Sequence, residues 1–127
     1  MKRLSVGLCA ALFLLGCTEP TPQAKVEENA RAEISKRLQK PLEVTYGKVL
    51  KEDEIEAMNK CLSADLVSKL TTEEKLFLGG NTAEKTKVAK EADNVASKLL
   101  FTSNEFKGSL KTCSAVVGVV KAINKVK

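Results

Sequence analysis

Apolar side chains recur at intervals of three or four residues over most of this chain, and that spacing is the strongest constraint on its fold. The clearest run contains Ile55, Met58, Leu62, Leu66 and Leu70. Residues at this spacing share one face of an α-helix, so the run predicts an amphipathic helix that begins near Asp53. Other segments repeat the pattern. The sequence therefore predicts a mainly α-helical fold.

The segment before this helix carries the same pattern and then loses it. Its apolar residues fall four apart: Val26, Ala30, Ile34 and Leu38. Pro41 is expected to end this helix, because the proline ring disfavours the helical conformation of the residue before it. Residues 42–46 then alternate between apolar and polar side chains, which is a weak strand signal. We expect a short edge strand or an extended connection there.

The second half of the chain predicts further helices. Residues 71–74 and 81–84 each contain the Ser/Thr/Asn and Glu spacing of a capping box. The second box is expected to start one helix with an apolar face of Val88, Ala92, Val95 and Leu99. Residues 102–104 should break it. From Ser109 onward a helix is favoured over a buried strand, although residues 115–120 are rich in β-branched side chains. A small bundle of about four helices is therefore expected.

The N-terminus has the composition of a targeting segment. Lys2 and Arg3 precede a run without charge from Leu4 to Leu15. A helix that spans a bilayer needs about 20 apolar residues, and this run is shorter. Its length fits the apolar part of a signal peptide, which is typically about 7 to 15 residues.

The motif Leu14-Leu15-Gly16-Cys17 follows this run and resembles the lipobox of bacterial lipoprotein precursors. The resemblance implies that a diacylglycerol is attached to the Cys17 thiol and that the chain is cut after Gly16. Thr18 stands where an aspartate would resemble an inner-membrane retention signal. Its presence favours the periplasmic face of the outer membrane, with the inner membrane as the alternative. The other reading is an ordinary secretory signal that is cleaved further on.

These features divide the chain into three parts. Residues 1–16 are the expected signal peptide. Residues 17–28, which include two prolines, are the expected lipidated tether. Residues 29–127 are expected to form a single helical periplasmic domain, since the mature chain has the size of one domain.

Two cysteines, Cys61 and Cys113, remain after the expected processing and lipidation. In an oxidising periplasm, a cysteine pair in a small domain most often forms a disulfide. Closing a loop of about 50 residues would stabilise the fold by about 4 kcal/mol on the chain-entropy model. The chain has no Cys-x-x-Cys motif, so we expect a structural bond and no redox function.

The sequence offers little for catalysis. It has no histidine, the commonest general base and metal ligand, and it lacks the serine-hydrolase and nucleotide-binding motifs. The acidic residues between Glu52 and Glu56 fit a helix start, where anions are favourable. Aromatic residues are few and the positive charge is mild, which argues against nucleic-acid binding. We therefore expect no enzyme, no metal, no cofactor, no nucleic acid and no small-molecule substrate.

The remaining hypothesis is a binding protein. The chain is similar in format to pilotins, the short-tethered helical lipoproteins of secretion systems, which implies an accessory role for an envelope protein. A groove between the 55–70 and 88–99 helices would receive the partner. The apolar run of Leu76, Phe77 and Leu78 is a candidate partner contact, with burial in the core as the alternative. The alternative functions are an exclusion lipoprotein directed against an incoming plasmid or phage (superinfection exclusion), or an inhibitor of an envelope enzyme.

Overall fold

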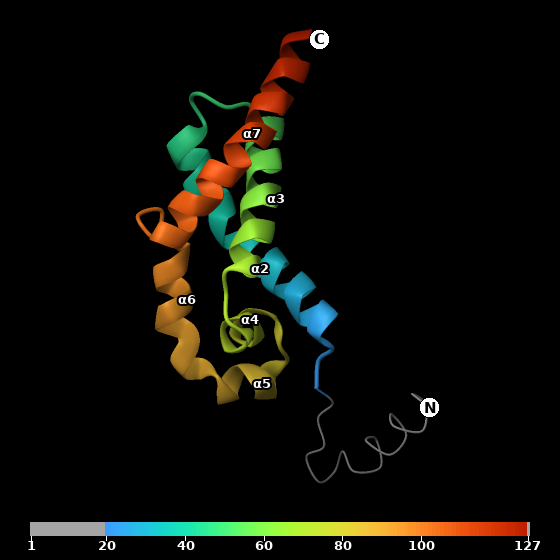
Figure 1. Cartoon of the computed structure of the whole chain (residues 1–127), viewed down its shortest axis with the longest axis vertical. Helices are drawn as coiled ribbons and strands as arrows, with labels where there is room; N and C mark the ends of the chain where they lie inside the picture. Colours follow the sequence, from blue (N-terminus) through green and yellow to red (C-terminus); the bar gives the residue numbers. More distant parts are fainter. Residues whose placement is uncertain (1–19, 127) are drawn as a thin grey trace, which may run out of the picture.

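The computed structural model describes residues 20–126, which form six α-helices and one 3-10 helix, with no strand in that range (Figure 1). The long helices are α2 (Gln23–Tyr46), α3 (Glu52–Ser68) and α7 (Asn104–Val126). The short ones are α4 (Thr72–Gly79), α5 (Thr82–Lys87), η2 (Ala89–Glu91) and α6 (Ala92–Leu99). The predicted mainly α fold is confirmed. The predicted signal peptide and Cys17 lie outside the described residues.

Helix α2 is longer than predicted at both ends. Its buried stripe continues through Leu42, so the prediction that Pro41 ends the helix and that residues 42–46 are extended is wrong. Leu42 is fully buried, and burying a leucine contributes about 1.5–3 kcal/mol. That gain offsets much of the cost of a proline inside a helix, about 3 kcal/mol. At the other end α2 begins at Gln23, so the second half of the expected tether is helical.

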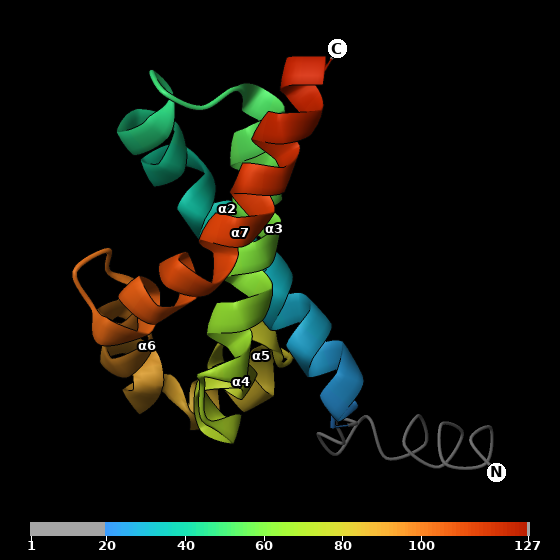
Figure 2. The same ribbon diagram turned by 45° about the horizontal axis from the view of Figure 1, so that its top comes forward.

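Helix α3 forms as predicted and is the centre of the molecule. It packs against α2 on one side and α7 on the other. Figure 2 shows α3 and α7 running in opposite directions along each other. The predicted apolar face is buried, and Leu62 and Leu66 are completely inaccessible to solvent. The helical prediction for the segment after Ser109 is also confirmed, since α7 is continuous from Asn104 to Val126.

Helix α4 crosses the first half of α2 at a point where a side chain does not fit. A Cβ atom at Gly79 would overlap the carbonyl oxygen of Val26. The Asn29 side-chain amide donates a hydrogen bond to the Gly79 carbonyl across the same contact, at 3.0 Å. Both predicted capping boxes are present, at Thr71 and Asn81. Gly79 therefore serves close packing between two helices as well as the end of α4.

The single helix predicted between Asn81 and Leu99 is wrong. The chain leaves the helical conformation at Val88 and forms α5, η2 and α6 in succession. Val88 and Val95 are both buried, whereas Ala92 between them is only half-buried. The break lets α5 stay beside α4 while α6 turns toward α7 (Figure 1). We call residues 82–99 the α5–α6 arm. Its division into α5 and α6 adds one helix to the expected four, and α4 adds another.

Candidate functional site

An apolar groove opens between α2 and the end of α6, with a volume of about 480 Å³. Helix α2 contributes Arg37, Leu38 and Pro41, and the other wall is formed by Ala96 and residues 99–102. The prediction that the groove lies between the 55–70 and 88–99 helices is wrong. Helix α3 occupies the centre of the bundle between α2 and α7, so the partner of α6 across the groove is α2.

The outer wall of the groove is an apolar turn that the sequence fixes locally. Leu100 adopts an extended conformation at the end of α6 and remains 58% exposed. Phe101 stacks on the buried ring of Phe106, with ring centroids 4.2 Å apart. The Ser103 hydroxyl accepts a hydrogen bond from the Phe106 N–H and donates one to the Lys98 carbonyl. This cap holds the turn in the position that presents Leu100 to solvent.

The inner wall is the second half of α2. Pro41 lies in the helix interior and its ring contributes apolar surface to the groove. Among the described residues of the lining, Arg37 is the charged one, and its Nε is ion-paired with Glu33 at 3.2 Å. The pair leaves the other guanidinium N–H groups, which are hydrogen-bond donors, at this edge of a mostly apolar groove. Such an edge favours a partner group that carries negative charge.

A buried ion pair fixes the arm that carries the outer wall. Lys98 on α6 contacts the carboxylate of Glu74 on α4 at 2.7 Å, and Glu74 is only 3% exposed. Burial raises the pKa of Glu74, but hydrogen bonds from Lys98 and from the Thr71 N–H outweigh it, so the pKa lies below its ordinary value. The carboxylate therefore stays charged at neutral pH and the pair holds α6 against α4.

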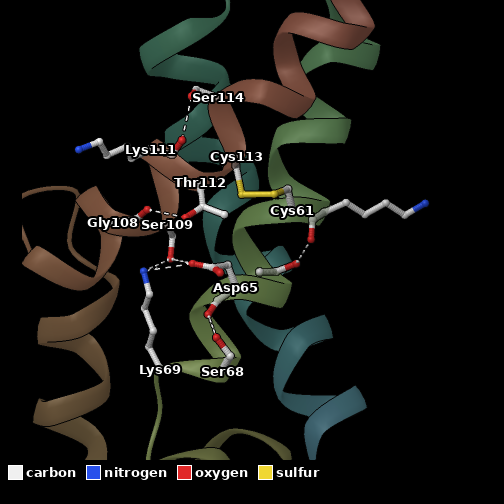
Figure 3. The surroundings of a disulfide bond; sticks show 12 residues. Cys61, Asp65, Ser68, Lys69, Gly108, Ser109, Lys111, Thr112, Cys113 and Ser114 are labelled. Carbon is white, nitrogen blue, oxygen red and sulfur yellow. Dashed lines mark hydrogen bonds and ion pairs between the residues drawn. A yellow bond between two sulfur atoms is a disulfide. The ribbon is translucent and has the colours of Figure 1, made fainter.

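The predicted disulfide joins α3 to α7. Cys61 and Cys113 are bonded, with Cα atoms 5.7 Å apart (Figure 3). One helical turn further along, the Ser109 hydroxyl donates to Asp65 at 2.6 Å. One turn beyond that, the ammonium of Lys69 donates to the Glu105 carbonyl at 3.2 Å. These three cross-links occur at successive turns of two antiparallel helices. We call them the α3–α7 seam.

Ser109, Lys69 and Asp65 together resemble a hydrolase constellation by residue type, but their geometry is structural. Lys69 approaches the Ser109 hydroxyl at 3.0 Å, and that hydroxyl is completely buried. A catalytic serine must reach its substrate. The Ser109 hydrogen bond, followed by Lys69, holds the pKa of Asp65 below its ordinary value despite partial burial. The cluster therefore acts as a charged cross-link within the seam.

The candidate contact Leu76, Phe77 and Leu78 is divided between core and surface. Leu78 belongs to the core, and the half-buried Phe77 packs against the core. Leu76 lines a smaller hollow of about 260 Å³ near Pro20. These three residues do not line the α2–α6 groove. The apolar run that does so is Leu99, Leu100 and Phe101, which follows the same pattern of an apolar triplet just before a helix break.

Within the described residues, no group of three acidic or cysteine side chains is placed to hold a metal ion. No helix in that part of the chain is long and apolar enough to cross a bilayer. Comparisons with protein families, with curated proteins and with solved structures found no match to this chain.

Proposed function

We propose that this protein is a lipid-anchored, non-enzymatic accessory protein that binds an apolar segment of another envelope protein in the α2–α6 groove. The observation that carries the proposal is the exposure of Leu100 beside an open apolar groove. A concave surface lined mainly by apolar side chains marks a candidate binding site, and the exposed Leu100 extends that apolar surface at the rim of the groove.

The shape and charge of the groove define the partner segment. A volume of about 480 Å³ accommodates a few apolar side chains, such as the anchors that an amphipathic helix presents three or four residues apart. Arg37 supports a segment that also carries a carboxylate on one flank. The proposed partner element is therefore a short apolar helix with an acidic residue beside its anchors.

The proposed setting is the periplasmic face of the outer membrane. The lipobox resemblance of residues 14–17 supports a lipid anchor, and the Cys61–Cys113 bond supports an oxidising compartment. Two or more acyl chains hold a protein stably at a membrane. An accessory protein held there would meet envelope proteins as they arrive at that membrane.

The test is chemical crosslinking in the producing cells, followed by purification of the tagged protein. Leu100→Asp places a charge in the groove and should abolish capture of the partner. Val49→Asp is the matched control, because Val49 is 67% exposed but lies in the loop between α2 and α3, away from the groove. It should leave capture unchanged.

A Cys17→Ser form tests the anchor in the same experiment. We expect it to leave the membrane fraction and to capture less of the partner. If Leu100→Asp and Val49→Asp capture the same proteins as the unmodified chain, the groove is not the binding site. If no envelope protein is captured by any form, the proposal fails and superinfection exclusion is the function to assay.

A further inference from the structure

The first described residues are fastened to the α5–α6 arm. The Thr21 backbone N–H and hydroxyl donate to the two carboxylate oxygens of Glu84, at 3.1 and 2.7 Å. The Asn81 N–H donates to the same carboxylate at 2.8 Å. The hydrogen bond from Asn81, followed by that from Thr21, lowers the pKa of Glu84. Glu84 therefore remains charged at neutral pH, and the chain is held in place from Thr21 onward.

We call the hydrogen bonds between Thr21 and Glu84 the clamp. The clamp shortens the connection between Cys17 and the folded body. A tether that reached residue 28 would span about 35 Å when extended. Only four peptide units separate Cys17 from Thr21, and they reach at most about 14 Å. A lipid on Cys17 would therefore keep the clamped end of the body within about 14 Å of the headgroup layer.

The clamped end is one pole of an elongated molecule. The start of α2, α4 and α5 lie together at one end, and the α2–α3 loop and the C-terminal part of α7 lie at the other (Figures 1 and 2). Helix α2 connects the two ends, and its 24 residues measure about 36 Å. Because the body is longer than the connection, both of its ends can touch the membrane only if the body lies flat on it.

The surface of the clamped end suits phospholipid headgroups. Lys85, Lys87 and Lys90 are exposed there, and lysines near a membrane attract anionic lipid. Acidic residues share this end of the molecule: Glu73 on α4 and Asp93 on α6 are exposed, whereas Glu84 accepts hydrogen bonds in the clamp and Glu91 accepts one from the Asn94 amide at 3.1 Å. The hollow of about 260 Å³ beside Pro20 adds apolar lining from Leu76 and Ala83.

We propose that the α5 end of the protein rests on the phospholipid surface that holds its lipid anchor, so that the body stands with the α2–α3 loop away from the membrane. This inference rests on the proposed lipid on Cys17. Leu38 follows Thr21 by 17 residues, which places the groove about 25 Å further along α2. The groove would then face partner segments above the membrane surface.

The test uses the lipidated full chain, purified and inserted into vesicles of phosphatidylcholine and phosphatidylglycerol in which part of the phosphatidylcholine carries a nitroxide quencher on its headgroup. A fluorescent amino acid is incorporated at Thr86 on α5 or, as the matched control, at Val49 in the distant loop. The headgroup nitroxide quenches only fluorophores that lie close to the headgroup layer. We expect most of the fluorescence at position 86 to be lost and that at position 49 to be retained. Equal quenching, or stronger quenching at position 49, would overturn the proposed orientation.

Two controls test whether the short connection and the lipid anchor cause the difference in quenching between positions 86 and 49. A Gly-Ser linker of about eight residues, inserted between Thr18 and Glu19, lengthens the connection without touching the clamp. Quenching at position 86 should then fall toward that at position 49, and an unchanged difference would overturn the short connection as its cause. Vesicle flotation tests the anchor itself. If the protein floats with the vesicles but shows equal quenching at the two positions, only the proposed orientation is overturned. If the protein does not float, the proposed lipid anchor is overturned as well.

Discussion

The α3–α7 seam and the α5–α6 arm are held in different ways, although both consist of helices with a similar mixture of apolar residues and lysines. Three cross-links at successive turns join α3 to α7, and buried apolar residues line the length of their contact. The arm buries only Val88 and Val95 among its apolar side chains. It depends on the Lys98–Glu74 pair and on the Thr21–Glu84 clamp.

The difference matters because one wall of the groove lies on α2, which packs against the seam helix α3, and the other lies on the arm and its end. Helix α2 packs along α3 and belongs to the fixed part of the molecule. Ala96, Leu99 and Leu100 belong to the arm or its end. Elements with few buried apolar contacts open locally at a lower free energy than the core does. The groove therefore combines a fixed wall with an adjustable one, which suits the binding of a segment from another protein.

The largest expected effect is in the seam. Replacing both cysteines, Cys61→Ala with Cys113→Ala, should lower the free energy of unfolding by about 4 kcal/mol, because the bond closes a loop with a sequence separation of 52. Urea denaturation of the two proteins measures the difference. A loss below about 1 kcal/mol would mean that the seam does not depend on its disulfide.

The next effect is in the arm. Lys98→Ala leaves the buried Glu74 carboxylate without its cation and should cost about 3 kcal/mol, measured by thermal unfolding. Lys25→Ala is the control, because its pair with Glu28 is exposed on both sides and should contribute less than about 0.5 kcal/mol. If both substitutions cost the same, the arm does not depend on this pair.

Acid should weaken both regions by a smaller amount, because protonation weakens hydrogen bonds without removing either partner. The pKa values of Asp65 and Glu74 are lower in the folded chain than in the unfolded chain. Their contribution to stability is therefore complete above the unfolded-state pKa and is lost as the pH falls through the folded-state pKa. We expect the free energy of unfolding to decline below about pH 4, measured by urea denaturation. Stability that rises on acidification would contradict these assignments.

The smallest expected effect is at Gly118, and Gly79 is the contrasting position. Nothing lies within 4 Å of a Cβ placed at Gly118, so Gly118→Ala should raise the stability by about 0.5–1 kcal/mol through helix propensity alone. Gly79→Ala should instead be destabilising, because its Cβ would overlap the backbone of α2. Thermal unfolding of both variants measures this. A destabilising Gly118→Ala would show that this part of α7 is more closely packed than the structure has it.

The helices that local pattern determines were predictable from the sequence. The apolar stripe from Ile55 to Leu70 became α3, and the capping boxes at Thr71 and Asn81 mark real helix starts. The cysteine pair was also predictable, because the fold contains no other cysteines once the expected signal peptide and Cys17 are set aside. In these places local sequence and burial favour the same structure.

The errors lie where tertiary packing overrides a local rule. Pro41 is a helix breaker by its chemistry, but burial of Leu42 keeps α2 helical. Val88 continues a helical stripe by spacing, yet the chain breaks there so that α5 stays beside α4. The position of the groove was predicted wrongly for the same reason. Arg37 and Leu100 line the same groove only because of the path that the arm takes through the fold. The apolar triplet from Leu99 to Phe101 was the one signal in the sequence that could have indicated it.

Hydrogen–deuterium exchange of the intact, oxidised protein tests most directly whether a fixed scaffold carries an adjustable groove wall. Amides in α6, from Ala92 to Leu99, should exchange through local opening, well before the protein unfolds globally. Amides around Cys61 and Cys113 should exchange only on global unfolding. If α6 is protected as strongly as the seam, the two regions form one cooperative unit and the account of an adjustable wall is contradicted.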